Sequence, residues 1–446
     1  MDFIPTGVYP EFILTTRHAM SILKEVLKHE VFPALGCTEP IAVAYAASIA
    51  TAEIGGAVEE MRITVDPGVF KNGLAVIIPN TDGERGNLIA GVLGALVANP
   101  SLKMEVLADV TPDLIRRAIE LIRSGVVKID YDQSKKHLLI DVTVRTTNGT
   151  ARAILAHSHT NLIRLEKNGS VLLDSGGGTG APGDPAYRTR LKDMSMADII
   201  DEAKNMDEDD CAYIQKGIDM NVRIAEKGLT LKKVGHYIAD LVKKGYLQDD
   251  VLSSSKIMTA AASDARMSGI SFPTMSSGGS GNQGIVAILV PYNVGKYFKV
   301  DGRTILRSIA LSHLINSYIK CFTGDLSPLC GCSIAAGVGA ATAIVYQTAG
   351  KDLGKITLAV NTLVSDLGGM LCDGAKPGCA LKVASSTDSA IRSAYMALNG
   401  HGITEEEGFV GKTAEETIYY LGLIGKTGME HVDNTILAIM QEKIHG

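Results

Sequence analysis

A glycine- and proline-rich stretch, "DSGGGTGAPGDPAYRT" at residues 174–189, divides the chain into two parts of different character. It is short of apolar side chains and favours neither helix nor strand, so we interpret it as a linker. Residues 60–173 are mostly short segments of β-forming sequence, whereas apolar residues beyond the linker recur at helical spacing. The sequence therefore predicts an α+β protein, with a small α+β domain that carries a short-stranded sheet and a large all-helical domain.

The predicted domain boundaries follow the same pattern. Residues 11–31 show helical spacing and end before a proline, and "IAVAYAASIATAEIGG" reads as a second helix closed by glycine. We expect residues 1–58 to form N-terminal helices that pack with the helical domain, 59–185 to form the α+β domain and 186–446 the helical domain. Strands are expected in "MRITVDPGVF", "GLAVIIPN", "KMEVLADV", "HLLIDVTVRTT", "TARAILAHSH" and "NLIRLEKNGSVLL", and helices near 85–98 and 112–124.

Composition excludes several classes of function. The chain has 446 residues, 46% of them apolar, which is enough for a sizeable core. Its net charge is −6 and no long block of like charges occurs, so we expect neither a nucleic-acid groove nor a membrane-binding patch. The uncharged run "GCSIAAGVGAATAIVYQTAG" is built from Ala and Gly, which is typical of a buried helix rather than a membrane span. Because the N-terminal residues lack the features of an export signal, we expect a cytoplasmic protein with reduced thiols.

Four of the seven cysteines fall within one short part of the helical region, in "SPLCGCSIAAG" and "GGMLCDGAKPGCALK". Cys330 and Cys332 are separated by one residue, and Cys372 and Cys379 by six. These spacings fit the paired hooks of a structural zinc site poorly, whereas iron–sulfur clusters tolerate varied spacing and use thiolates from loops at helix ends. Four buried thiols that pack as small apolar groups are the alternative. Cys211 and Cys321 lie in ordinary helical sequence, and we interpret them as structural.

A second motif, "SSGGSGNQG" at residues 276–284, is a glycine-rich turn before the apolar run "IVAILV". Such a turn exposes backbone N–H groups, and the positive end of a following helix suits an anion. No Gly-Lys-Ser/Thr follows, so this is not a P-loop. A plain connecting turn is the alternative interpretation.

Two shorter motifs carry reactive side chains. In "GCTEP", Glu39 and Pro40 are typical of a helix start, which would place Cys37 at the positive end of the helix and lower its thiol pKa. "HSHTN" offers His157 and His159 on one face of an expected strand. They are possible metal ligands, although a polar cluster beside a turn is commoner.

Taken together, "GCTEPIAVAYAAS", "SSGGSGNQG", "LCGCSIAAG" and "CDGAKPGCALK" resemble the L-cysteine desulfidase family, a branch of the iron–sulfur L-serine dehydratases. The resemblance runs from about residue 15 to 435, with the four motifs in the family's order. It implies a [4Fe–4S] cluster with one iron open to substrate, held by Cys332, Cys372 and Cys379, with Cys330 as the competitor for the first position. It also implies a role for Cys37 in activity, as an acid/base or as a removable fourth ligand.

The same resemblance implies a reaction and a set of binding residues. The reaction is the non-redox β-elimination of L-cysteine to hydrogen sulfide, ammonia and pyruvate, with the open iron accepting the leaving sulfur. The expected substrate-binding residues are Ser276, Ser277, Gly278, Gly279, Asn282 and Glu39. We expect Lys382 to add positive charge at the site, and the partner to be a small amino acid, with no nucleic acid or membrane. The many small-residue helices would suit a homodimer.

Three other functions stay open at this stage. The same scaffold would serve L-serine, with a hydroxyl as the leaving group. A non-catalytic protein that stores or senses metal would ligate its site completely. A pyridoxal-phosphate lyase needs a Schiff-base lysine, for which Lys376 and Lys382 are candidates, but no phosphate-binding cup is evident beside them.

Overall fold

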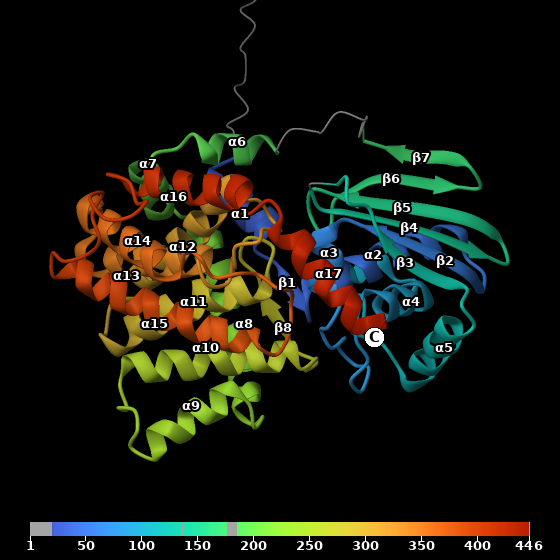
Figure 1. Cartoon of the computed structure of the whole chain (residues 1–446), viewed down its shortest axis with the longest axis horizontal. Coiled ribbons are helices and arrows are strands. Elements are labelled where there is room, and N and C mark those ends of the chain that lie inside the picture. Colours follow the sequence, from blue (N-terminus) through green and yellow to red (C-terminus); the bar gives the residue numbers. More distant parts are fainter. Residues whose placement is uncertain (1–19, 136, 176–184, 446) are drawn as a thin grey trace, which may run out of the picture.

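The computed structural model describes residues 20–135, 137–175 and 185–445. Two parts lie side by side (Figure 1): a bundle of helices and a twisted sheet with helices against it. Two clusters of buried apolar side chains correspond to these parts. The predicted α+β class is confirmed, whereas the boundaries 59–185 and 186–446 stay a prediction. Most of the predicted linker lies outside the described residues.

The sheet has six strands in the order β3-β2-β4-β5-β6-β7. All neighbouring pairs are antiparallel except β2 and β3, which are parallel. The strands are β2 (Val58–Val65), β3 (Val127–Tyr131), β4 (Leu139–Thr146), β5 (Gly149–Ala156), β6 (Leu162–Lys167) and β7 (Ser170–Asp174). Alternate side chains of β2 and β4 are buried, as a sheet with one covered face requires.

Helices cover that face. They are α2 (Thr38–Ile54), α3 (Pro67–Gly73), α4 (Asn87–Val97), the 3₁₀ helix η1 (Pro100–Glu105) and α5 (Pro112–Arg123). Helix α2 packs against α4, β4 and β5, and at the closest approach of α2 and α4 a Cβ on Gly94 would lie 2.1 Å from the carbonyl oxygen of Ala44. The expectation that both N-terminal helices pack with the helical part therefore fails for α2, because its small side chains fit closely under the sheet.

The helical part contains most of the remaining elements. They are α1 (Ile22–Glu30), α6 (Ala186–Lys192), α7 (Met196–Lys204), α8 (Glu208–Leu229), α9 (Val234–Lys243), α10 (Val251–Met267), α11 (Gly281–Tyr297), α12 (Gly302–Thr323), α13 (Ala335–Ala349), α14 (Leu353–Leu367), α15 (Cys379–Leu398), α16 (Ala414–Leu423), the π-turn η2 (Ile424–Gly428) and α17 (Val432–His445). Helix α13 is the Ala/Gly-rich run, and it packs between α12 and α15. Within the described ranges, no helix has both the length and the apolar content needed to cross a membrane.

Most predicted elements appear, with some differences. Helices α4 and α5 and the strands β4 and β5 match their predicted segments. "NLIRLEKNGSVLL" divides into β6 and β7, and "MRITVDPGVF" holds the end of β2 and then α3, which Asp66 caps and Pro67 starts. "GLAVIIPN" holds only an isolated bridge from Ile77 to Arg85, and "KMEVLADV" starts inside η1 because its apolar side chains pack under α2. Strand β3 was not predicted. The part of the first predicted helix before residue 20 lies outside the described residues.

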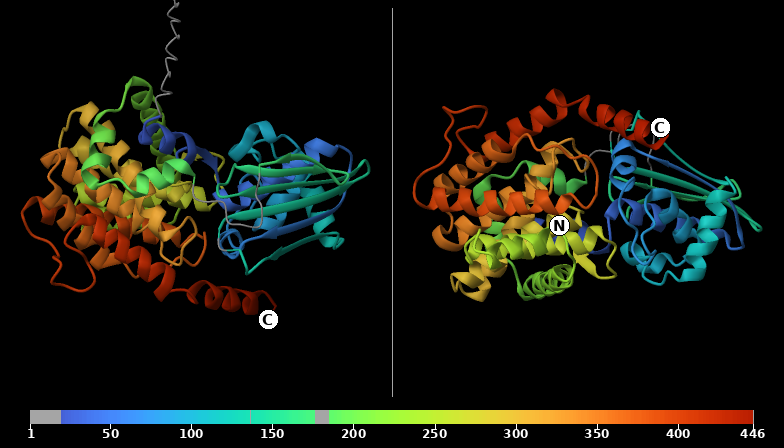
Figure 2. Two further views of the ribbon diagram at one scale, coloured as in Figure 1. Left: turned by 90° about the horizontal axis from the view of Figure 1, so that it is seen from above. Right: turned by 60° about the horizontal axis from the view of Figure 1, so that its bottom comes forward.

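The small β1–β8 sheet and helix α17 are among the contacts that join the parts. Strands β1 (Pro33–Leu35) and β8 (Pro273–Met275) form a small antiparallel sheet. Helix α17 leaves the helical part and extends to the sheet side (Figure 2), where Asp433 pairs with the buried Lys71 at 2.6 Å.

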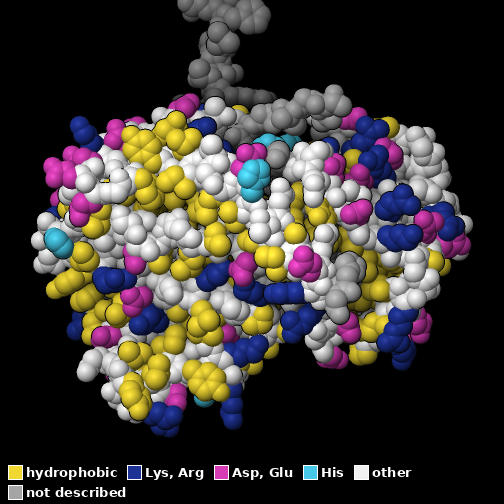
Figure 3. Space-filling model, viewed as in Figure 1, with side chains coloured by type: hydrophobic (Ala, Val, Ile, Leu, Met, Phe, Trp, Pro, Cys, Tyr) yellow, Lys and Arg dark blue, Asp and Glu magenta, His cyan; other side chains and the backbone are white. Residues whose placement is uncertain are grey.

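On the face drawn in Figure 3, basic and acidic side chains are interspersed.

Candidate active site

The β1–β8 pairing brings two distant motifs together. Pro33 pairs with Met275 and Leu35 with Pro273, so "GCTEP" and the glycine-rich turn leave opposite ends of the same three-residue antiparallel ladder. The N–H of Gly279 donates to the carbonyl of Glu30 at 2.9 Å, which fixes the turn against the end of α1.

A second set of backbone contacts aligns the cysteine loops. The N–H of Cys330 donates to the carbonyl of Met370 at 2.8 Å, and the N–H of Cys372 donates to that of Pro328 at 2.7 Å. Cys379 is the first residue of α15, close beyond the second loop. Thiols from two loops and a helix start therefore face one region.

One cavity of about 70 Å³ collects most of the expected site residues. The expected residues that line it are Cys37, Glu39, Gly278, Gly279, Asn282, Cys330, Cys332, Cys372, Cys379 and Lys382. Lining residues that the sequence did not single out for this site include Asn72, Arg266, Lys320 and Asp325, and His159 is there too. Ser276 and Ser277 are not among them.

The two serines are occupied elsewhere, contrary to the expectation that they donate to substrate. The hydroxyl of Ser276 donates to the carbonyl of Glu30 at 3.0 Å and accepts from the N–H of Phe32 at 2.9 Å. That of Ser277 accepts from Asn316 and pairs with the ring of His313. Both hydroxyls hold the turn in place because their backbone lies just inside the packed core.

The glycines of the turn do reach the cavity. Gly278 and Gly279 have φ values of 54° and 73°, in the left-handed region that favours glycine. Asn282 also lines the cavity, but its amide carbonyl accepts from Ser263 and its amide nitrogen contacts the sulfur of Met267. Backbone N–H groups, rather than hydroxyls, are thus the donors that this turn has to offer.

The Cys37 thiol differs from the expectation. Cys37 is indeed the residue before α2, but burial and the adjacent Glu39 carboxylate raise its pKa well above the usual range. The thiol donates to Glu39 Oε2 at 2.9 Å. The predicted thiolate at a helix start is therefore wrong, because burial and a neighbouring negative charge outweigh the helix dipole.

Glu39 itself stays ionised. Burial opposes its charge, but the positive charge of His159 in its protonated form and hydrogen bonds from Cys37 and Asn72 outweigh burial and lower its pKa. Asn72 donates to Glu39 Oε1 at 3.0 Å. The cavity therefore holds a fixed carboxylate at one wall.

The four late thiols influence one another. Cys330 and Cys332 share a hydrogen bond, which lowers the pKa of Cys330 to about 6 and raises that of Cys332 well above its usual range. Burial raises the pKa values of Cys372 and Cys379. All seven cysteines are free thiols.

Lys382 lines the cavity, but its ammonium is already engaged. It donates to Asp373 Oδ1 and to the carbonyl of Leu371, both at 2.6 Å. It therefore ties down the loop that carries Cys372, and its charge also favours the thiolate of Cys330.

The thiols of the cavity suit an iron–sulfur cluster better than a single zinc ion. Among the described residues, no three His, Cys, Asp or Glu side chains are arranged to hold a metal ion. A single zinc ion needs donors that converge within about 2.0–2.3 Å of one point, which this arrangement does not offer. A cluster is bound through several irons by thiolates set further apart, and four thiols on one cavity wall supply the right chemistry. The residues fit an iron–sulfur cluster in donor type, and all four thiols line the same cavity.

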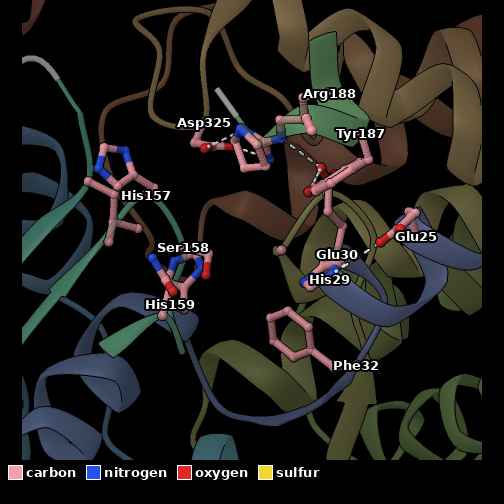
Figure 4. Close-up of a pocket in the computed structure, with 16 residues that line it drawn as sticks. Glu25, His29, Glu30, Phe32, His157, Ser158, His159, Tyr187, Arg188 and Asp325 are labelled. Atoms are coloured by element: carbon pink, nitrogen blue, oxygen red, sulfur yellow. Dashed lines mark hydrogen bonds and ion pairs between the residues drawn. The ribbon is translucent and has the colours of Figure 1, made fainter. Parts of the chain in front are cut away.

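A larger pocket of about 440 Å³ adjoins the cavity (Figure 4). Both are lined by His159, Gly278, Gly279 and Asp325. The pocket lies between α1 and α6 on one side and the turn after β5 on the other. It is wide enough to serve as the approach for a small molecule.

A charge network forms one wall of this pocket. Arg188 donates to both oxygens of Asp325 at 2.7 and 2.8 Å and to Glu30 at 2.8 Å. Lys320 pairs with Asp325 at 3.0 Å and also donates to the carbonyl of Gly278. Two cations and two carboxylates are matched here, and the Lys320 ammonium also holds the glycine turn through the carbonyl of Gly278.

The two histidines of "HSHTN" occupy different positions around the site. Both follow the end of β5 in a turn, where His157 has φ 69°, so they do not share a strand face as expected. His159 enters the cavity with Nε2 buried and without a hydrogen-bond partner, whereas His157 lines the larger pocket. Burial lowers the pKa of His159, which favours a neutral ring. The motif identified both histidines as candidates, but it could not predict that only His159 reaches the smaller cavity.

Comparison with known proteins places the chain in a family. The serine dehydratase alpha chain family matches residues 91–438. A UPF0597 protein of Geobacter sulfurreducens is 60% identical over 424 residues, covering 95% of this chain and 99% of the relative. UPF0597 proteins of Elusimicrobium minutum and Alkaliphilus oremlandii are 54% and 40% identical, covering 95% and 94% of this chain and 100% and 98% of the relatives. The chain belongs to the serine dehydratase alpha chain family, which is a family of lyases.

Proposed function

We propose that this chain is an iron–sulfur lyase that eliminates hydrogen sulfide from L-cysteine, releasing pyruvate and ammonia. The observation that carries the proposal is the single cavity that gathers four thiols, the glycine turn and Cys37 from distant parts of the chain. Thiols on one wall and backbone donors on another supply the two needs of such a reaction. These are a site for the cofactor and a site for the amino acid.

The cofactor would be a [4Fe–4S] cluster. Cys332, Cys372 and Cys379 would hold it, with Cys330 as the alternative to Cys332. When bound, its open iron would supply Lewis-acid character for the departing β-sulfur.

The chain's own residues would bind the substrate and move its proton. Backbone N–H groups of the first turn of α11, which follows Gly278 and Gly279, would orient the substrate carboxylate. His159 Nε2 is buried, has no partner and belongs to a ring whose pKa is lowered, so it is suited to accept the Cα proton. Cys37 stays protonated against Glu39, which makes it a poor base.

The bond changes balance without a redox partner. The Cα–H bond breaks, its proton goes to His159, and its electron pair forms the Cα=Cβ double bond. The Cβ–S bond breaks and its electrons leave with sulfur. The released aminoacrylate tautomerises to an imine, and water hydrolyses it to pyruvate and ammonia.

L-Serine is the second candidate substrate, and the family match favours it. The same loss of the Cα proton to His159 would expel the β-hydroxyl, which takes up one proton and leaves as water. Sulfide and pyruvate release from the two amino acids, measured side by side without oxygen, distinguishes them. We expect the higher kcat/KM with cysteine, and a clear preference for serine would replace the first assignment.

The cofactor is tested by replacing cysteines one at a time in anaerobically purified protein. We expect about four irons and four sulfides per chain, and a large loss of both in Cys372→Ala and Cys379→Ala. Cys332→Ala and Cys330→Ala identify the remaining ligand. Cys211→Ala and Cys321→Ala are the matched controls, because these buried thiols lie outside the cavity and should keep the cluster.

The same preparation tests the other classes of function. Zinc without sulfide would support a metal-storage or sensing protein and contradict the lyase. An absorption band of bound pyridoxal phosphate would also contradict the cluster. Lys376, one lysine candidate for that cofactor, is paired with Asp373.

A further inference from the structure

Arg266 is a buried cation that makes no ion pair within the described part of the chain. It lies in the last turn of α10 and is only 2% exposed. Its Nε and Nη2 are buried and make no hydrogen bond, and none of the ion pairs among the described residues includes it. A buried charge without a partner lowers the stability of the fold, so such a residue points to a ligand of opposite charge that binds there.

The guanidinium lies directly on the first turn of α11. A Cβ on Gly281 would lie 2.3 Å from Arg266 Nε, so only glycine lets the side chain occupy this position. Ser280 precedes the helix and its side chain makes no capping bond. The first N–H groups of α11 and the positive end of its dipole therefore add to the charge of Arg266.

The opposite side of the same cavity carries His159. A Cβ on Gly279 would lie 3.4 Å from its Nδ1, so the ring sits against the glycine turn. Its Nε2 is the other unpartnered buried nitrogen named above. Arg266 and His159 thus face a common space from the helical part and from the sheet part.

We propose that Arg266, together with the N-terminus of α11, binds the α-carboxylate of the amino-acid substrate. This inference rests on the proposed function and adds to it the group that selects an α-amino acid. A guanidinium and a carboxylate match in planar, two-bond geometry, and both Arg266 nitrogens without partners belong to that donor fork. With the carboxylate held there, Cα would face His159 across the cavity and the β-substituent would face the thiols.

The test measures binding, so that it does not depend on turnover. L-Alanine has the α-amino and α-carboxylate groups but nothing to eliminate, and L-alaninol lacks only the carboxylate. Isothermal titration of the full, cluster-loaded chain without oxygen gives a Kd for each. We expect the wild type to prefer L-alanine by about tenfold or more, as a charge-assisted double hydrogen bond provides.

Variants then assign that preference to one side chain. In Arg266→Gln we expect the preference to fall to about twofold or less, and in Arg266→Lys to an intermediate value because the charge stays but the fork is lost. Arg303→Gln is the matched control. Arg303 is an exposed arginine paired with Glu208 and should keep the wild-type preference.

Three outcomes would overturn the inference. They are a wild type with no preference for L-alanine, an Arg266→Gln protein that keeps the preference, and an Arg266→Gln protein that loses iron and sulfide, which would make Arg266 a counter-ion of the cluster. Failure of the proposed function looks different, since cysteine and serine would then yield no pyruvate while the alanine preference could persist. If Arg266→Gln does not fold, the preference for L-alanine over L-alaninol in the wild type and in Arg266→Lys still tests the inference.

Discussion

Two buried arginines near the site have opposite surroundings. Arg188 is 8% exposed and makes ion pairs with Glu30 and Asp325, whereas Arg266 is 2% exposed and makes none among the described residues. Paired charge strengthens a scaffold because removal of one member leaves another uncompensated. Unpaired charge costs stability and is useful only where something binds. The comparison teaches which buried cations build the site and which one we infer is kept for the ligand.

Loss of Arg188 should give the largest effect. Arg188→Met leaves Asp325 and Glu30 with fewer partners, and we expect the free energy of unfolding to fall by about 3–5 kcal/mol. Denaturant unfolding measures this value. Arg303→Met at the surface should cost no more than about 1 kcal/mol. Equal losses in both variants would contradict the scaffold role of the network.

Acid should weaken the same network. Burial alone would raise the pKa values of Glu30 and Asp325, but Arg188 and Lys320 outweigh it and lower both. Carboxyls with depressed folded pKa values contribute stability above their unfolded pKa of about 4 and lose it as the pH falls further. The wild type should therefore lose stability steeply below about pH 4. Unfolding curves at a series of pH values should show a shallower acid slope for Arg188→Met, and an unchanged slope would count against the assignment.

A methyl group on the first turn of α11 should displace Arg266. Gly281→Ala places a Cβ against Arg266 Nε, so we expect the preference for L-alanine over L-alaninol to drop by about tenfold, equivalent to about 1.4 kcal/mol. Gly302→Ala is the matched control, because Gly302 is the first residue of α12 and a Cβ there meets open space. Titration of both variants with the two ligands checks the difference. The same preference in the two would mean that Arg266 does not depend on Gly281.

Loss of Arg266 should have the smallest effect on stability. Arg266→Met removes a buried charge without stranding a partner, so we expect the free energy of unfolding to stay within about 1 kcal/mol of the wild type or to rise. The same denaturant experiment as for Arg188→Met measures it. A loss as large as that of Arg188→Met would show that Arg266 is part of the scaffold after all.

Short motifs made much of the site predictable. The four late cysteines, Cys37 and the glycine turn are recognisable because each motif is contiguous and its chemistry is local. The roles of Ser276 and Ser277 were not predictable, because whether a hydroxyl meets a ligand or the core depends on which backbone packs over it. The Cys37 pKa failed for the same reason, since the helix start is visible in the sequence and the burial is not.

The sequence by itself determined the α+β class, most of the helical and strand segments and the cysteines that we propose as cluster ligands, since these follow from periodicity and residue type. Only the tertiary structure decided that α2 packs under the sheet, that β1 pairs with β8, and that Arg188 is neutralised while Arg266 is not. Strand pairing and ion pairing depend on distances between segments that are far apart in the chain. Those distances are set by packing, which no local pattern records.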